Sequence, residues 1–184
     1  MNMKKHIYNM KKLHWDSRFF AGIYFQFVLV VVLVSWGAYG AGYRINTTPS
    51  VARGLWRIHP HVEPQRYDYV AVSPHGNPGL EFGVKRGYIT EHTILLKKIV
   101  ATEGDYVCYD VNERAVTVNG NPILATEILS QDAAGRPLQG ADFPVLLKEG
   151  QVWLSSEYIR GYDSRYFGPV SLDILTKATP VWVF

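Results

Sequence analysis

The chain has 184 residues, 47% of them hydrophobic, and a formal net charge of only +3. This length suits one domain with an appendage. The single cysteine, Cys108, excludes an intrachain disulfide and any metal site that needs several cysteines, and we expect it to pack in a strand as a small apolar side chain. Much of the basic surplus lies in the first 18 residues, and no later basic stripe alternates with aromatic residues, so we expect no nucleic-acid partner.

The N-terminal part predicts a membrane anchor. Residues 1–18 form a basic segment with Asp16 as its only acid, and no charged residue occurs in residues 19–43. Roughly 20 apolar residues cross the hydrocarbon core of a bilayer, so residues 19–43 are predicted to form a single transmembrane helix. The basic flank should stay in the cytoplasm and residues 44–184 should lie outside. A cleaved signal peptide is the alternative, because residues 37–41 include small side chains, but the length of the apolar run favours retention.

Residues 44–184 predict a mostly β domain. Aromatic residues are plentiful, and glycine and proline are frequent, which is typical of strands joined by turns. Short strands are expected at residues 56–58, 67–72, 94–100, 106–109, 115–118, 151–154 and 181–183. A tight turn is expected at Asn119-Gly120. Residues 73–87 are rich in Gly and Pro and predict an irregular loop, and residues 126–149 predict an inserted loop.

A hydroxyl-rich turn follows the predicted anchor, with the sequence Asn46-Thr47-Thr48-Pro49-Ser50. Pro49 and Gly54 punctuate this segment, so it can expose Ser50 without placing it in a regular element. Ser, Pro and Gly are also ordinary loop residues. The turn alone therefore fits either a plain connecting loop or a serine nucleophile held near a membrane surface.

Two adjacent lysines, Lys97 and Lys98, interrupt an apolar strand. Neighbouring side chains of a strand point to opposite faces, so one of the two is expected to point inward. Burial of an ammonium group lowers its pKa, which is the property that a general-base lysine needs near neutral pH. Periodicity does not tell which lysine is buried, and an edge strand whose two lysines both reach solvent is the alternative.

A third segment combines two opposite charges with aromatic residues in a turn. Its sequence is Gly161-Tyr162-Asp163-Ser164-Arg165, followed by Tyr166-Phe167-Gly168. Asp163 and Arg165 could pin the turn or could orient catalytic groups, and spacing alone favours neither interpretation.

Taken in order, these segments resemble three motifs of the signal peptidase family, the membrane-bound serine peptidases with a Ser–Lys mechanism. Thr48-Pro49-Ser50-Val51 resembles the nucleophile motif. Residues 96–105 resemble the general-base motif, in which the first residue of the basic pair is the base, and residues 163–170 resemble the closing motif. The resemblance spans about residues 45–125 and 153–172. In size and detail the chain is most similar to the TraF branch, the conjugative-transfer peptidases that mature a pilin subunit.

The resemblance implies a fold, a site and a setting. The fold would be a domain of coiled antiparallel β-sheets behind the N-terminal helix. Ser50 would be the nucleophile, Lys97 the general base and Asp163 the residue that positions Lys97. The Ser50 N–H and the Thr48 hydroxyl would hold the oxyanion, while Arg165 and Ser164 would support the site, with no metal or cofactor. The setting would be the bacterial inner membrane, with the catalytic domain in the periplasm, a small prepilin as substrate, and membrane lipid and other conjugative transfer proteins as partners.

Three departures from the general signal peptidase pattern indicate a specialised relative. Val51-Ala52 stands where signal peptidases usually carry Met followed by another residue and Pro. Gly161 stands where they often have a serine that hydrogen-bonds the lysine, and residues 158–160 replace acidic and Asn-containing residues. In the TraF branch the acyl-enzyme is expected to be resolved by water or by the amine of the substrate's own N-terminus, which would produce a circular peptide.

Other functions fit parts of the sequence. A general type I signal peptidase would use the same chemistry on many secretory presequences. A membrane-tethered, non-enzymatic scaffold of a transfer apparatus would need neither Ser50 nor Lys97. A Ser-His-Asp hydrolase would depend on one of the histidines, which are, outside the N-terminal segment, His59, His61, His75 and His92. A metalloprotease is disfavoured because the H-E-x-x-H motif is absent.

Overall fold

The structure is a computed structural model, and it describes residues 17–184. The chain divides into two compact units, Met1–Gly40 and Ala41–Phe184. Of the predicted basic segment, residues 1–18, the first 16 residues lie outside the described part. The described part of the first unit is helix α1 (Ser17–Gly40).

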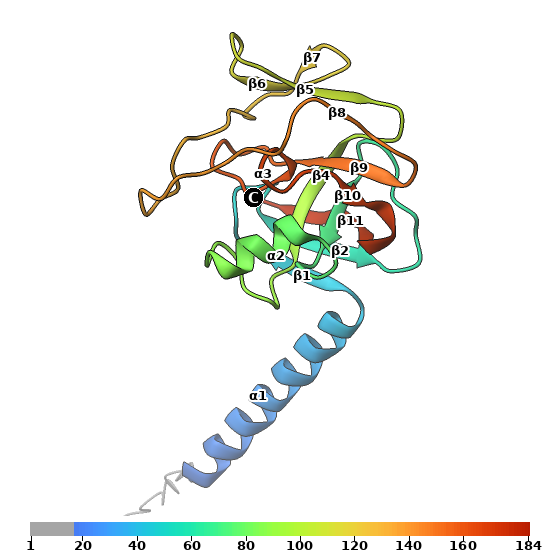
Figure 1. Cartoon of the computed structure of the whole chain (residues 1–184). Helices are drawn as coiled ribbons and strands as arrows, with labels where there is room; N and C mark the ends of the chain where they lie inside the picture. The colour runs from blue at the N-terminus through green and yellow to red at the C-terminus, as the bar shows by residue number, and fades with distance from the viewer. Residues whose placement is uncertain (1–16) are drawn as a thin grey trace, which may run out of the picture. The chain divides into compact units, whose positions relative to one another are not determined.

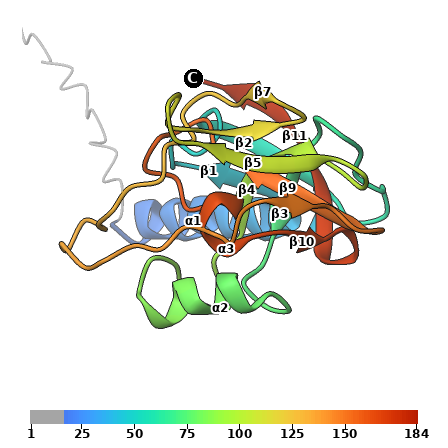
Figure 2. The same ribbon diagram turned by 45° about the horizontal axis from the view of Figure 1, so that its top comes forward.

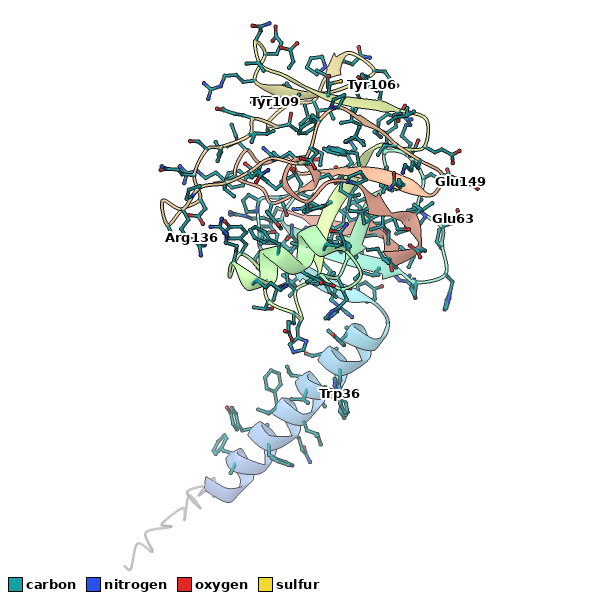
Figure 3. The ribbon with its side chains drawn as sticks, in the orientation of Figure 1. Trp36, Glu63, Tyr106, Tyr109, Arg136 and Glu149 are labelled. Carbon is teal, nitrogen blue, oxygen red and sulfur yellow. The ribbon has the colours of Figure 1, made fainter. Side chains whose placement is uncertain are left out.

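Helix α1 carries exposed apolar side chains along its length, and Figure 3 shows Trp36 projecting from it. Its segment Phe20–Gly40 is long and apolar enough to cross a membrane. A single helix of this kind near an N-terminus also fits a signal sequence, so retention of the helix stays a prediction. The helix ends at Gly40, and Tyr43 already belongs to the first strand, so the helix stops before residue 43.

The second unit is built on a seven-stranded sheet with the order β1-β2-β11-β3-β4-β9-β10, in which every neighbouring pair is antiparallel. Its strands are β1 (Tyr43–Asn46), β2 (Gly54–His59), β3 (Tyr69–Val72), β4 (Leu95–Ala101), β9 (Gln151–Ser155), β10 (Val170–Ser171) and β11 (Leu175–Val183). Strand β11, near the end of the chain, joins β2 to β3 (Figure 1). The sheet is curled, because segments near its two ends are in contact. Glu157 follows β9, Ser50 lies between β1 and β2, and the Glu157 N–H donates to the Ser50 carbonyl.

A second sheet has four strands in the order β7-β6-β5-β8. Its strands are β5 (Tyr106–Asp110), β6 (Ala115–Val118), β7 (Asn121–Pro122) and β8 (Val145–Leu146). Asn119 and Gly120 both have positive φ between β6 and β7, which confirms the predicted tight turn. With two antiparallel sheets and little helix outside α1, the prediction of a mostly β fold with one N-terminal helix is confirmed.

Apolar side chains fill three buried clusters of the second unit. One cluster covers the face of the central strands that α2 and α3 also contact, and it contains Val70, Val72, Leu80, Ile99, Leu154 and Phe167. Another covers the opposite face and contains Val51, Trp56, Ala71, Leu96 and Ala178. The third joins the two sheets through Ala101, Val107, Val116, Leu147 and Trp153. Strand β4 contributes to all three, so burial of apolar surface on both of its faces fixes its position.

The prediction of an irregular loop at residues 73–87 is wrong in its middle, where helix α2 (Pro78–Lys85) forms. The Asn77 side chain caps the helix by accepting a hydrogen bond from the Leu80 N–H, and Pro78 suits a first turn, where its missing N–H removes no bond. Figure 2 shows α2 on the same side of the domain as helix α3 (Ser164–Phe167). The Gly and Pro residues that predicted a loop therefore begin a helix and let it approach α3.

Residues 126–149 contain little regular structure apart from β8 and an isolated bridge between Gln131 and Pro137. Arg136, labelled in Figure 3, donates to the Asp132 carboxylate and to the Arg86 carbonyl. The Tyr88 hydroxyl also donates to Asp132. These bonds fasten the segment to the chain that follows α2. The remaining regular element is a short 3₁₀ helix, η1 (Leu172–Ile174).

Candidate active site

Ser50 lies in the turn between β1 and β2, and the side chain of Asn46 organises this turn. The Asn46 Nδ2 donates to the carbonyls of Thr48, Val51 and Ala52 at 3.0–3.2 Å. Its Oδ1 accepts from the Thr48 N–H at 3.1 Å and from the Thr48 Oγ1 at 2.8 Å. One buried amide thus satisfies backbone groups that no regular element could satisfy. Asn46 was not among the predicted site residues, although asparagine is common in turns.

The Ser50 hydroxyl is bonded within its own turn. Ser50 is 8% exposed, and its Oγ lies 3.0 Å from the Thr48 Oγ1. Since the single hydroxyl proton of Thr48 is directed at Asn46, Ser50 donates its proton to Thr48. Thr48 would therefore have to turn its proton away from Asn46 before it could donate to an oxyanion. The Ser50 N–H meets no acceptor among residues 17–184, so it is available as a donor.

Of the two adjacent lysines, Lys97 is the one that points inward. Lys97 is 2% exposed, whereas Lys98 is half-buried and its Nζ lies 5.6 Å from the ring centre of Tyr69. Strand β4 is paired with β3 on one side and β9 on the other, so the edge-strand alternative is wrong. Lys97 lies opposite Val70 of β3 and shares a strand face with Leu95 and Ile99. The strand therefore holds an ammonium group against apolar side chains.

This environment changes the protonation of Lys97. Burial lowers the pKa of Lys97 to about 8; the negative charge of Asp163 raises this pKa, and the positive charge of Arg165 lowers it. Within residues 17–184, Lys97 makes no hydrogen bond or ion pair, and so it is not hydrogen-bonded to Ser50. A neutral amine is consequently accessible near neutral pH, which a lysine with an ordinary pKa does not provide.

Asp163 and Arg165 form a buried ion pair at the start of α3. Asp163 is 1% exposed, and Arg165 is fully buried. The Arg165 Nε donates to Asp163 Oδ1 at 2.8 Å, and its second terminal nitrogen donates to Oδ2 at 2.7 Å. This two-point geometry holds the carboxylate in one orientation. Asp163 also caps α3 by accepting from the Arg165 N–H at 3.1 Å.

The rest of the Arg165 guanidinium connects segments that are distant in the sequence. It donates to the carbonyls of Ala125, Glu127, Tyr158 and Ile159 at 2.8–3.2 Å. The neighbouring Ser164 Oγ accepts from the Leu154 N–H of β9 at 2.9 Å. The supporting roles of Arg165 and Ser164 in a reaction stay predictions. The ion pair with Arg165 fixes the position of Asp163. Asp163 and Lys97 do not form an ion pair, so Asp163 affects Lys97 only through the electrostatic effect of its charge.

A cavity of about 620 Å³ lies beside this region. Its wall includes three consecutive residues that follow or end β9, namely Ser155, Ser156 and Glu157. The lining also includes Lys98, Val118 and Leu124, so it mixes charged, polar and aliphatic groups. Two of the lining residues, Ser156 and Glu157, donate to the Ser50 carbonyl, but no residue of the turn that carries Ser50 lines the cavity itself. A peptide segment would fit such a volume.

Comparisons with known proteins agree with the motifs. The family described as "Signal peptidase, peptidase S26" matches residues 16–183. The conjugal transfer protein TraF of Agrobacterium fabrum (strain C58) is 35% identical over 154 residues, covering 78% of this chain and 84% of that protein. A plasmid transfer protein TraF of Escherichia coli is 31% identical over 160 residues, covering 82% and 88%.

Among solved structures, a signal peptidase I from Enterococcus faecalis V583 is 21% identical, with a TM-score of 0.36 over 62% of this chain and 94% of that one. The sequence matches extend across almost the whole second unit and the apolar helix. They confirm the resemblance to signal peptidases and to TraF proteins of conjugative transfer. The roles of individual residues stay predictions.

Proposed function

Since this chain belongs to the peptidase S26 family of signal peptidases, we propose that it is a membrane-anchored serine peptidase that uses Ser50 and Lys97 to process a conjugative prepilin. The observation that carries the proposal is the buried Lys97, with its pKa lowered to about 8 in the strand that the general-base motif occupies. The TraF relatives support the conjugative setting. Residues 1–18 would be cytoplasmic, residues 19–43 the anchor in the inner membrane, and residues 44–184 the periplasmic catalytic domain.

In the proposed reaction, neutral Lys97 takes the Ser50 hydroxyl proton while Ser50 Oγ forms a bond to the scissile carbonyl carbon. The Ser50 N–H, joined by Thr48 once its hydroxyl proton turns, stabilises the oxyanion, and each such donor contributes roughly 3 kcal/mol to the transition state. Collapse breaks the C–N bond, and the Lys97 ammonium returns its proton to the leaving amine. This gives an acyl-enzyme on Ser50.

Two nucleophiles can then release the acyl group. Water gives a linear product with a new carboxylate. The N-terminal amine of the same substrate gives a circular peptide and no net addition of water. The similarity to TraF proteins of conjugative transfer is the reason to test for cyclisation first.

The first experiment is mass spectrometry of a prepilin from a conjugation system, co-expressed with the full-length chain. We expect Ser50→Ala and Lys97→Met to abolish processing, while the matched variant Lys98→Met leaves it intact. A wild-type product lighter by one water than the linear cleaved chain would identify cyclisation.

Three outcomes would contradict the proposal in different ways. Processing by both Ser50→Ala and Lys97→Met would favour the non-enzymatic scaffold. Cleavage of many secretory presequences at similar rates would favour a general type I signal peptidase. Loss of activity on replacing one of the four histidines alone would favour a Ser-His-Asp hydrolase.

A further inference from the structure

Ser156 is bonded to both of the residues that frame the proposed site. It is buried, and it follows β9 directly. Its Oγ donates to the Ser50 carbonyl at 3.2 Å, and its backbone N–H donates to Asp163 Oδ2 at 2.9 Å. Among residues 17–184, no other residue is hydrogen-bonded to both Ser50 and Asp163.

The Ser156 hydroxyl both donates and accepts a hydrogen bond. It accepts from the Tyr158 N–H at 3.2 Å while it donates to the Ser50 carbonyl, so its only proton is in use and its orientation is fixed. The Ser50 carbonyl also receives the Glu157 N–H at 2.9 Å. Two donors that follow β9 therefore hold the carbonyl of the peptide group that follows Ser50.

Gly161 is adapted to this hydroxyl. A Cβ at position 161 would clash with both Oγ and Cβ of Ser156 and would approach the Tyr158 carbonyl at 2.9 Å. That carbonyl accepts from the Gly161 N–H at 2.8 Å, so the two segments are held in contact. A side chain at position 161 and a side chain at position 156 thus compete for one space, and this chain fills it from position 156.

We infer that Ser156 is a positioning residue for the peptidase reaction: its hydroxyl fixes the backbone of the nucleophile Ser50 relative to the Asp163 carboxylate. The inference rests on the proposed function. It states that a hydroxyl in the space between positions 156 and 161 sets the angle at which Ser50 Oγ is presented, while the Ser156 backbone keeps Asp163 in place. Misplacement of a reacting group by about 1 Å can cost 10²-fold in rate.

The test uses the full-length protein in detergent and a fluorogenic peptide that spans the cleavage junction mapped in the prepilin experiment. We expect Ser156→Ala to lower kcat by about 10- to 100-fold, with KM within about twofold of wild type. The pH midpoint of kcat/KM should not move, because the bond from the Ser156 backbone to Asp163 remains. A merely structural role predicts a lower melting temperature without a fall in the kcat of the folded fraction, and that result would overturn the inference.

Two double variants separate the hydroxyl from the shape of the site. Ser156→Gly with Gly161→Ala removes the clash with the Ser156 side chain and the hydroxyl together, whereas Ser156→Gly with Gly161→Ser returns a hydroxyl from position 161; the close approach to the Tyr158 carbonyl is common to both variants. We expect the variant with serine at position 161 to be at least tenfold faster. Equal rates would overturn the claim that a hydroxyl in this space matters.

Amide hydrogen exchange tests the positioning role of Ser156 without relying on peptidase activity. In Ser156→Ala we expect faster exchange in residues 46–55 and at Glu157, since the turn loses one of its fixed bonds. This result, together with a wild-type protein that cleaves no peptide, would leave the positioning of Ser50 standing and reject the peptidase function. Unchanged exchange would reject the positioning role even in an active enzyme.

Discussion

The turn that carries Ser50 and the interior that holds Lys97 are built by different forces. The turn is held by a neutral amide, Asn46, and by backbone hydrogen bonds close to the surface. In the interior near Lys97, Asp163 and Arg165 form an ion pair, and Lys97 remains outside it. The difference separates geometry from electrostatics: neutral hydrogen bonds orient the nucleophile, and buried charges set the protonation of the base.

The largest effect is expected when the interior loses Arg165. Arg165→Met leaves the Asp163 carboxylate buried without its partner and leaves four carbonyls without a donor. Removing one partner of a buried pair costs roughly 3–5 kcal/mol, so the free energy of unfolding should fall by that amount in denaturant titrations. The control is Arg114→Met, whose ion pair with Glu127 lies at the surface, with the Arg114 side chain 70% exposed, and should contribute under about 1 kcal/mol. A similar fall in the free energy of unfolding in both variants would contradict the claim that the buried Asp163–Arg165 pair matters more than a surface pair.

Replacing Lys97 is expected to raise the free energy of unfolding, not to lower it. The folded pKa of about 8 lies below the value of about 10.4 in an unfolded chain, so below pH 8 the fold carries the full cost of a buried ammonium group. Lys97→Met should raise the free energy of unfolding by roughly 1–3 kcal/mol at pH 7 while abolishing activity. The gain over wild type should shrink as pH rises from about 8 to about 10. Lys98→Met should show no such gain, and a destabilised Lys97→Met protein at pH 7 would contradict the assignment.

The smallest effect on stability is expected in the turn. Asn46→Ala removes a side chain that satisfies several backbone groups, and it should lower the free energy of unfolding by roughly 1–2 kcal/mol. It should also lower the kcat of the protein that remains folded. Asn46→Asp keeps the acceptor for Thr48 but loses the donors to the three carbonyls, so it should recover little. The measurement is kcat together with the unfolding midpoint. Wild-type kcat in Asn46→Ala would show that the amide is dispensable for orientation.

The sequence predicted the interior better than the turn. Alternation along residues 94–100 predicted one inward lysine, yet it could not distinguish Lys97 from Lys98, or exclude an edge strand, without the neighbouring strands β3 and β9. Helix α2 was missed because glycine and proline usually break helices, and its stability comes from the Asn77 cap and the burial of Leu80. Ser156 carried no local signal, since its bond to Ser50 joins residues 106 positions apart. Long-range contacts of this kind appear only when the sheet has curled.

The pH dependence of kcat/KM tests most directly whether buried charges tune Lys97 as the base. We predict that kcat/KM for the cleavage-junction peptide rises with pH and levels off with a midpoint near 8. In Asp163→Asn the midpoint should be lower, because the negative charge that favours the Lys97 ammonium is gone. A profile independent of pH between 6 and 10, or a midpoint that Asp163→Asn leaves unchanged, would contradict the account.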